Sequence, residues 1–94
     1  MKTKKQVLAM FRQMQDKFFI GRELRGFASV EGYDQGNGYW TVKLSITEFN
    51  DDTREIIMSD RVEWTFWGKD RQTEQDEADN MAAVEAFREK YNLK

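Results

Sequence analysis

The chain has 94 residues, of which 39% are hydrophobic, 34% charged and 14% aromatic. This length suits one domain over residues 1–94, because two domains would each be too small to bury a stable core without disulfides or bound metal ions. The absence of cysteine excludes disulfides and thiolate chemistry, and the absence of histidine removes the commonest general base and metal ligand.

The formal net charge of −2 hides an asymmetry: residues 1–47 carry 8 basic and 4 acidic side chains, and residues 48–94 carry 7 and 13. No window holds the run of about 18 apolar residues that a membrane-spanning helix needs. The lysine-rich start precedes no apolar run, so we expect no signal peptide. Because small secreted domains usually carry disulfides, the sequence favours a cytoplasmic protein. The sequence contains neither a phosphate-binding loop nor a metal-ligand spacing, so we expect no cofactor.

Residues 3–19 are predicted to form an amphipathic helix. Thr3 can cap this helix, with Gln6 as its capping-box partner, and Gly21 is a plausible stop. Apolar side chains recur along it at helical spacing, as Val7, Phe11, Met14 and Phe18.

Three strands are predicted next, at residues 23–33, 39–49 and 55–67. The second strand alternates most clearly, with apolar residues at Trp40, Val42, Leu44 and Ile46. In the third strand Asp60 interrupts an apolar face that includes Ile56, and a bulge at Ser59 and Asp60 would explain the interruption.

Short glycine-rich and polar stretches between the strands predict antiparallel hairpins. Registers that place Val30 beside Val42 and Lys43 beside Arg61 keep the apolar residues of all three strands on one face. The opposite face is then mixed polar and exposed to solvent.

The last helix is predicted over residues 74–91, with Thr73 as the N-cap and Asp76 at the capping-box position. Its core stripe is Met81, Val84, Phe87 and Tyr91, and the alanines expected to allow close approach to the sheet are Ala78, Ala82 and Ala83. The assembled prediction is an α+β fold of αβββα order, with a three-stranded antiparallel sheet and both helices packed on one face.

This order of elements resembles the double-stranded-RNA-binding domain. The segment 77–87 also resembles the second helix of that family, in which single and paired alanines recur at this spacing. The family uses lysines at the start of this helix to contact RNA phosphates, but here the matching positions are Gln75, Asp76 and Asp79. The loop at residues 34–38 also lacks the family's histidine. The resemblance therefore implies the fold, and the departure predicts that RNA binding is lost.

Two groups of side chains are candidate partner-binding residues. The acidic group could dock a basic partner, or could simply cap and solubilise its helix: Glu74, Asp76, Glu77 and Asp79. The aromatic group lies off the apolar face of the strands, and could form an interface patch or merely cover the sheet edges: Phe27, Tyr33, Tyr39 and Trp67.

We therefore expect a non-catalytic protein-binding module, in the size and style of a small phage or bacterial inhibitor or accessory protein. Its partner is expected to be another protein or a second copy, bound at a sheet edge or the open face. The alternative function is binding of duplex RNA through scattered basic residues, Lys2, Lys4, Lys5, Arg22, Arg25 and Lys43. An enzyme is not expected. Glu31 and Glu63 could serve as acid and base, but no apolar pattern buries either carboxylate to raise its pKa.

Overall fold

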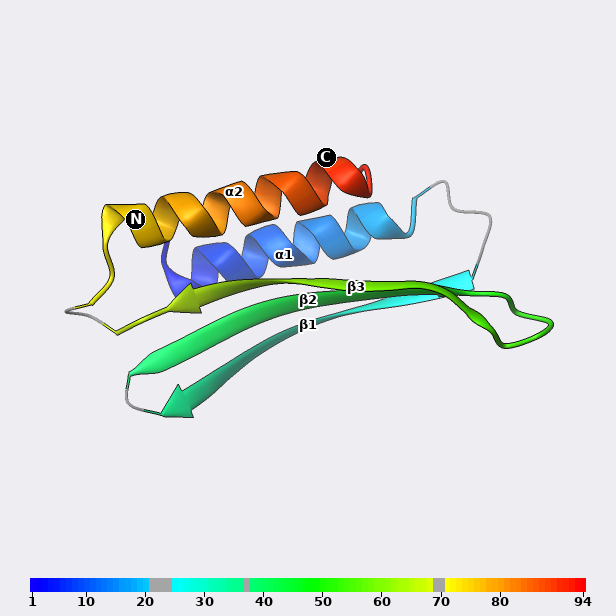
Figure 1. Ribbon diagram of the computed structural model, residues 1–94, viewed down its shortest axis with the longest axis horizontal. Helices are drawn as coiled ribbons and strands as arrows, with labels where there is room; N and C mark the ends of the chain where they lie inside the picture. Colours follow the sequence, from blue (N-terminus) through cyan, green and yellow to red (C-terminus); the bar gives the residue numbers. More distant parts are fainter. Residues whose placement is uncertain (21–24, 37, 69–70) are drawn as a thin grey trace.

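The structure is a computed structural model that describes residues 1–20, 25–36, 38–68 and 71–94 (Figure 1). Both helices lie over one face of a three-stranded antiparallel sheet with strand order β1-β2-β3. The predicted α+β fold of αβββα order is confirmed. The elements are α1 (Lys4–Phe18), β1 (Arg25–Gly36), β2 (Tyr39–Phe49), β3 (Ile56–Phe66) and α2 (Glu74–Lys90). Neither described helix is long and apolar enough to cross a membrane.

Both helices begin at the capping boxes that the sequence predicts. The Thr3 hydroxyl accepts from the Gln6 N–H at 3.2 Å, and the Gln6 side chain accepts from the Thr3 N–H at 2.8 Å. Thr73 and Asp76 repeat this exchange at α2, at 3.1 and 2.9 Å. Each bond satisfies an N–H that has no partner within the helix. The predicted stop at Gly21 lies outside the described residues.

The core lies between the helices and the sheet. Trp64 is its largest fully buried side chain, and the predicted stripes of α1 and β2 supply most of the rest. Complete burial of an aliphatic or aromatic side chain of this kind contributes about 1.5–3 kcal/mol. The buried set is Val7, Phe11, Met14, Phe18, Val42, Leu44, Ile46, Val62, Trp64, Val84, Phe87 and Leu93.

The strand registers differ from the predicted ones by two residues. Val30 lies opposite Leu44, and Lys43 lies opposite Glu63. Because side chains alternate between the two faces of a sheet, a shift of two residues leaves the side chains of the regularly paired residues on their predicted faces. The predicted faces are therefore right, and the predicted cross-strand neighbours are wrong.

The bulge predicted at Ser59 and Asp60 is also wrong, because the irregularity lies nearer the turn of this hairpin, between the pairs Glu48–Met58 and Phe49–Ile56. Asp60 stays in regular pairing on the helix side of the sheet. Its carboxylate accepts a hydrogen bond from the Tyr91 hydroxyl at the end of α2, so this position needs no break in the strand.

α2 lies over the edge of the sheet. It contacts β3, whereas α1 contacts β1 and β2. Val84 and Phe87 are buried and Met81 and Tyr91 half-buried, as the predicted stripe requires. The alanines predicted to approach the sheet are instead exposed, because a helix above an edge strand presents much of its circumference to solvent: Ala78, Ala82 and Ala83.

Candidate docking surface

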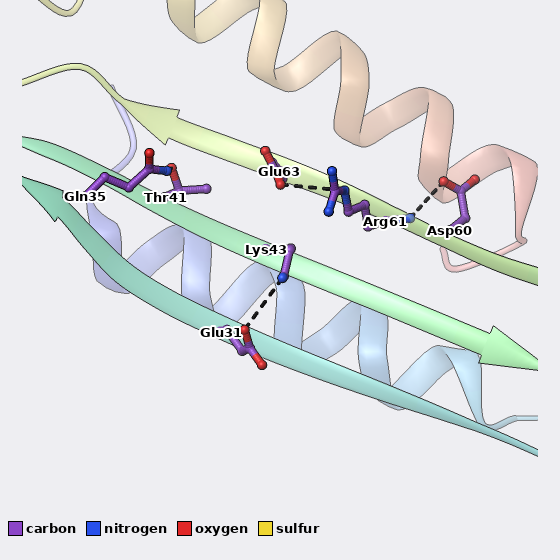
Figure 2. Close-up of polar contacts among 7 residues, drawn as sticks. All are labelled: Glu31, Gln35, Thr41, Lys43, Asp60, Arg61 and Glu63. Atoms are coloured by element: carbon purple, nitrogen blue, oxygen red, sulfur yellow. Dashed lines mark hydrogen bonds and ion pairs between the residues drawn. The ribbon is translucent and has the colours of Figure 1, made fainter.

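The face of the sheet opposite the helices is left uncovered by the described elements, and we call it the open face (Figures 1 and 2). Alternate residues of each strand project from it, as strand geometry requires. They are Phe27, Ser29, Glu31 and Tyr33 of β1, Thr41, Lys43, Ser45 and Thr47 of β2, and Ser59, Arg61, Glu63 and Thr65 of β3.

The middle of the open face holds two ion pairs (Figure 2). Lys43 Nζ lies 3.7 Å from Glu31 Oε2, and Arg61 Nε lies 3.7 Å from Glu63 Oε1. Glu31, Lys43 and Glu63 stand directly opposite one another on the three strands. Surface pairs of this kind add little stability, about 0–1 kcal/mol each. Their larger effect is that each cation of this region is matched by a carboxylate.

One end of the open face carries three aromatic residues, which we call the aromatic corner: Tyr33, Tyr39 and Trp67. The rings of Tyr39 and Trp67 meet edge to face, with centroids 4.8 Å apart and planes at 73°. Tyr33 is 38% exposed and Trp67 37% exposed. Lys43 Nζ lies 6.0 Å from the centre of the Tyr33 ring, within reach of a cation–π contact. The corner is an ordered but accessible apolar surface.

Hydrogen bonds fix the backbone and the polar side chains beneath this corner. Thr41 stands opposite Tyr33 and is only 1% exposed, although it belongs to the open face. Gln35 covers it and donates to its hydroxyl at 2.7 Å (Figure 2). Asp34 accepts from the N–H of Gly36 at 2.8 Å, where the β1–β2 register shifts. These bonds brace the end of β1, next to Tyr33.

The fourth predicted aromatic residue, Phe27, does not join the corner. It lies opposite Thr47, six residues back along β1 from Tyr33, a separation of about 20 Å at strand rise. Phe27 is 55% exposed, and other exposed apolar residues come from the segments that meet at this end: Phe19, Ile20, Ile56 and Ile57. Ile56 is 68% exposed, contrary to its predicted core position, because it lies beyond the irregularity between Glu48 and Phe49 in the β2–β3 pairing.

The acidic start of α2 is largely engaged within the chain. Asp76 caps the helix, and Asp79 accepts from the Gln75 amide at 2.8 Å. Glu77 accepts from the Lys2 backbone N–H at 2.8 Å and lies 3.8 Å from the N-terminal amine. Glu74 is exposed. This group lies in the helix layer, whereas the aromatic corner faces away from the helices, so the two predicted groups do not form one surface.

A polar cluster that the sequence did not indicate lies at the far end of α2. The hydrogen bond from Tyr91, assisted by Lys90 at 3.6 Å, holds the pKa of Asp60 below its usual value. Burial, followed by the hydrogen bond to Asp60, raises the pKa of Tyr91. A groove of about 440 Å³ beside the cluster separates β3 from α2 and includes Val62 and Phe87 in its lining. These groups tie α2 to β3.

Within the described ranges, no three His, Cys, Asp or Glu side chains form a group that could hold a metal ion. Comparison of the chain with models of protein families, with curated proteins and with solved structures finds no match. The function of the chain is therefore inferred from the geometry of its surface.

Proposed function

We propose that this protein is a non-catalytic binding module that docks another protein on its open face, with the aromatic corner as the anchor. The observation that carries the proposal is the edge-to-face pair of the half-buried Tyr39 and the exposed Trp67, beside the exposed Tyr33. Tyrosine and tryptophan dominate binding hot spots, because they bury a large area while few of their torsions must be fixed.

The charges of the open face favour a protein partner over a nucleic acid. Affinity for nucleic acids depends on Lys and Arg side chains that are free to neutralise phosphates. On this face Lys43 and Arg61 each face a carboxylate, on Glu31 and Glu63. A polar region of paired charges around an apolar anchor matches the composition of protein–protein interfaces.

The acidic start of α2 does not contribute to this anchor. Asp76 and Glu77 already satisfy backbone groups of the chain itself. Their engagement supports the interpretation that the acidic run caps and solubilises the helix, where the helix dipole stabilises negative charge.

The absence of catalysis is part of the proposal. Glu31 and Glu63, the carboxylates best placed to act as an acid and a base, are 59% and 40% exposed in their side chains and pair with cations. A carboxyl group becomes a general acid at neutral pH when burial raises its pKa, and solvent reaches both of these groups. A small inhibitor or accessory protein of the cytoplasm fits this picture.

The proposed docking face is tested by incorporating a photo-crosslinking phenylalanine analogue at Trp67, in cells of the protein's natural source. We expect adducts with another protein from position 67 and none from Gln13, an exposed residue of α1 on the helix side. Replacement of both Tyr33 and Tyr39 by alanine should lower the yield at position 67 by about tenfold or more, because the loss of hot-spot side chains costs about 2 kcal/mol or more.

Equal yields from positions 67 and 13 would contradict a face-specific interaction. An adduct consisting only of two copies of this chain would contradict docking of a different protein. Circular dichroism of each variant gives the folding control.

We further propose that the chain shares the architecture of the double-stranded-RNA-binding domain without its RNA function. The order of elements and the sheet support the first part, and the acidic residues at the start of α2 support the second. In an electrophoretic titration at low salt we expect no shift of duplex RNA at micromolar protein. Salt-sensitive binding that is lost when Lys4 and Lys5 are changed to glutamate would instead favour the RNA function.

A further inference from the structure

The two edges of the sheet differ in how their backbone groups are satisfied. In an antiparallel sheet each edge strand turns the N–H and C=O of every second residue away from its neighbour. The side-chain amide of Asn80 bonds both outward groups of Thr65, donating at 3.0 Å and accepting at 3.4 Å. The odd-numbered residues of β3 therefore face outward, and the alternation makes the even-numbered residues of β1 face outward as well. The bond from Gln15 to the Ala28 carbonyl, at 2.8 Å, agrees with this assignment.

Side chains bond outward backbone groups of β3 at Arg61 and Thr65, and at Trp67 just beyond the strand. Besides Asn80 at Thr65, the carboxylate of Asp60 accepts from the N–H of Arg61 at 2.8 Å (Figure 2). The side chain of Gln72 accepts from the N–H of Trp67 at 3.0 Å. Caps of this kind block the addition of another strand, which is how natural proteins protect exposed edges.

Among the described residues, the outer edge of β1 accepts a side-chain bond only at the Ala28 carbonyl. Beyond the Ala28 carbonyl, no described side chain bonds the outward N–H or C=O of Val30, Gly32 or Asp34. This uncapped stretch is symmetric about Gly32. A second copy of the same stretch, turned through a two-fold axis, therefore offers a donor for each acceptor and an acceptor for each donor.

We infer that two copies of this chain associate through their β1 edges, which pair antiparallel about a two-fold axis at Gly32. Gly32 then faces Gly32 of the second copy, and Val30 faces Asp34 of the second copy. About six backbone hydrogen bonds form, using the uncapped groups of both strands. The inference concerns a sheet edge and does not depend on the docking function proposed for the open face.

Two neighbouring registers, with the axis at Glu31 or at Val30, are less favourable because of their side chains. A two-fold axis at Glu31 would place two carboxylates directly opposite each other, which is destabilising. An axis at Val30 would require the Ala28 carbonyl, which Gln15 already occupies. The axis at Gly32 places Glu31 opposite Tyr33 of the second copy on the open face, without a like-charge pair.

On the helix side of this edge, Trp40 lies against Gly32 and offers apolar surface to a second copy. A Cβ atom on Gly32 would lie 2.2 Å from Cη2 of Trp40, so the indole ring occupies the space that a side chain would take. Trp40 remains half-buried, with Lys4 Nζ 5.1 Å from its ring. In the paired sheet the two indoles flank the axis, and their remaining apolar surface is buried.

Because the sequence contains no cysteine, the register can be tested by disulfide formation. Two separately tagged variants of the full chain, Glu31→Cys and Tyr33→Cys, are mixed and oxidised. We expect the mixed disulfide dimer as the main product, because these positions are opposed at a distance that a disulfide spans. A main product in which Glu31→Cys is linked to itself, or a mixed product only from Ser29→Cys with Glu31→Cys, overturns the register.

Association itself is tested by sedimentation of the unmodified chain and of two matched proline variants. Val30→Pro removes an outward N–H of β1, and Glu63→Pro removes an outward N–H of β3; neither removes a bond inside the sheet. We expect Val30→Pro to raise the dimer dissociation constant by about tenfold or more, since it deletes a hydrogen bond from each copy, and Glu63→Pro to leave it unchanged.

A chain that stays monomeric at millimolar concentration overturns the inference. Dimerisation that is weakened by Glu63→Pro and not by Val30→Pro overturns it as well. Circular dichroism shows whether each proline variant is folded, and the cysteine experiment tests the edge independently of both.

Discussion

Asp60 occupies a position on the helix side of β3 where the next residues in the same row, Val62 and Trp64, are buried. Its carboxylate accepts hydrogen bonds from the Tyr91 hydroxyl and from the N–H of Arg61. The bond from Tyr91 joins the end of α2 to an edge strand. A charged residue in an apolar row is tolerated here because the Tyr91 hydroxyl and the Arg61 N–H donate to its carboxylate, and the Lys90 ammonium lies 3.6 Å from it.

This contact has a pH dependence of defined sign. Because the folded pKa of Asp60 lies below its unfolded value, near 3.8, the contact contributes stability above about pH 4 and loses it as pH falls through the lowered pKa. Tyr91→Phe should lower the free energy of unfolding by about 1 kcal/mol near neutral pH, and by less below pH 4. Urea denaturation from pH 3 to 8 measures the difference.

The matched control for that experiment is Tyr33→Phe, which removes a hydroxyl from an exposed ring on the opposite face. Its effect should be small and independent of pH over the same range. A Tyr91→Phe deficit that grows as pH falls would contradict the assignment. At the alkaline end the raised pKa of Tyr91 means that the folded state resists ionisation, so stability should decline as pH rises above about 10.

The helices differ in how they attach to the sheet. α1 buries a continuous stripe, whereas α2 buries only Val84 and Phe87 and also makes polar contacts with β3. Asn80 supplies one of these contacts, because its amide bonds the backbone of Thr65 twice. This helix is therefore held by hydrogen bonds to an edge strand as well as by apolar packing.

Asn80→Ala should therefore destabilise the protein by about 1–2 kcal/mol, because it removes two hydrogen bonds and leaves half-buried backbone groups without partners. Gln75→Ala, on the exposed face of the same helix, should change stability by less than about 0.5 kcal/mol. Thermal and urea denaturation of the two variants measure the contrast. Equal effects would show that the amide of Asn80 does not secure α2.

The elements themselves were predictable from the sequence, because capping boxes and periodicity are local signals. β2 begins and ends where alternation predicts, and both capping boxes form. The registers were not predictable, because a shift of two residues keeps each side chain on the same face and fits the alternation of apolar and polar residues equally well. The positions of the alanines in α2 could not be inferred either, because they depend on where the helix lies across the sheet.

The candidate site was predictable in part, for similar reasons. Tyr33 and Tyr39 flank one hairpin turn, so their proximity follows from the sequence, and the distance of Phe27 along the strand could have been counted. The place of Trp67 depends on the β2–β3 register. The engagement of Glu77 with the backbone of Lys2 joins residues at opposite ends of the chain, and no local pattern indicates it.

The whole molecule is a thin, elongated double layer, with principal extents of 49, 25 and 18 Å. β2 is its centre, because both neighbouring strands pair with it. Val42, Leu44 and Ile46 are fully buried on its helix side, and Thr41 and Thr47 are almost fully buried on its open side. Stability should therefore be distributed unevenly across the fold.

We expect amide hydrogen exchange to be slowest in β2 and faster in α2, whose outer side is exposed along its length. Exchange measured by NMR at neutral pH gives the order directly. Protection in α2 that equals or exceeds protection in β2 would contradict this distribution and would show that the helix layer, and not the central strand, is the last part to open.

The capped edge of β3 also determines what kinds of assembly the sheet allows. A strand that joins this protein finds its longest uncapped stretch on the β1 border, since the chain's own side chains occupy outward groups of Arg61, Thr65 and Trp67 on the opposite border. Open-ended fibrils need two receptive borders on every subunit, so that each addition creates the site for the next. A sheet with a single receptive border ends its own growth after one addition, and any complex built on that border is finite.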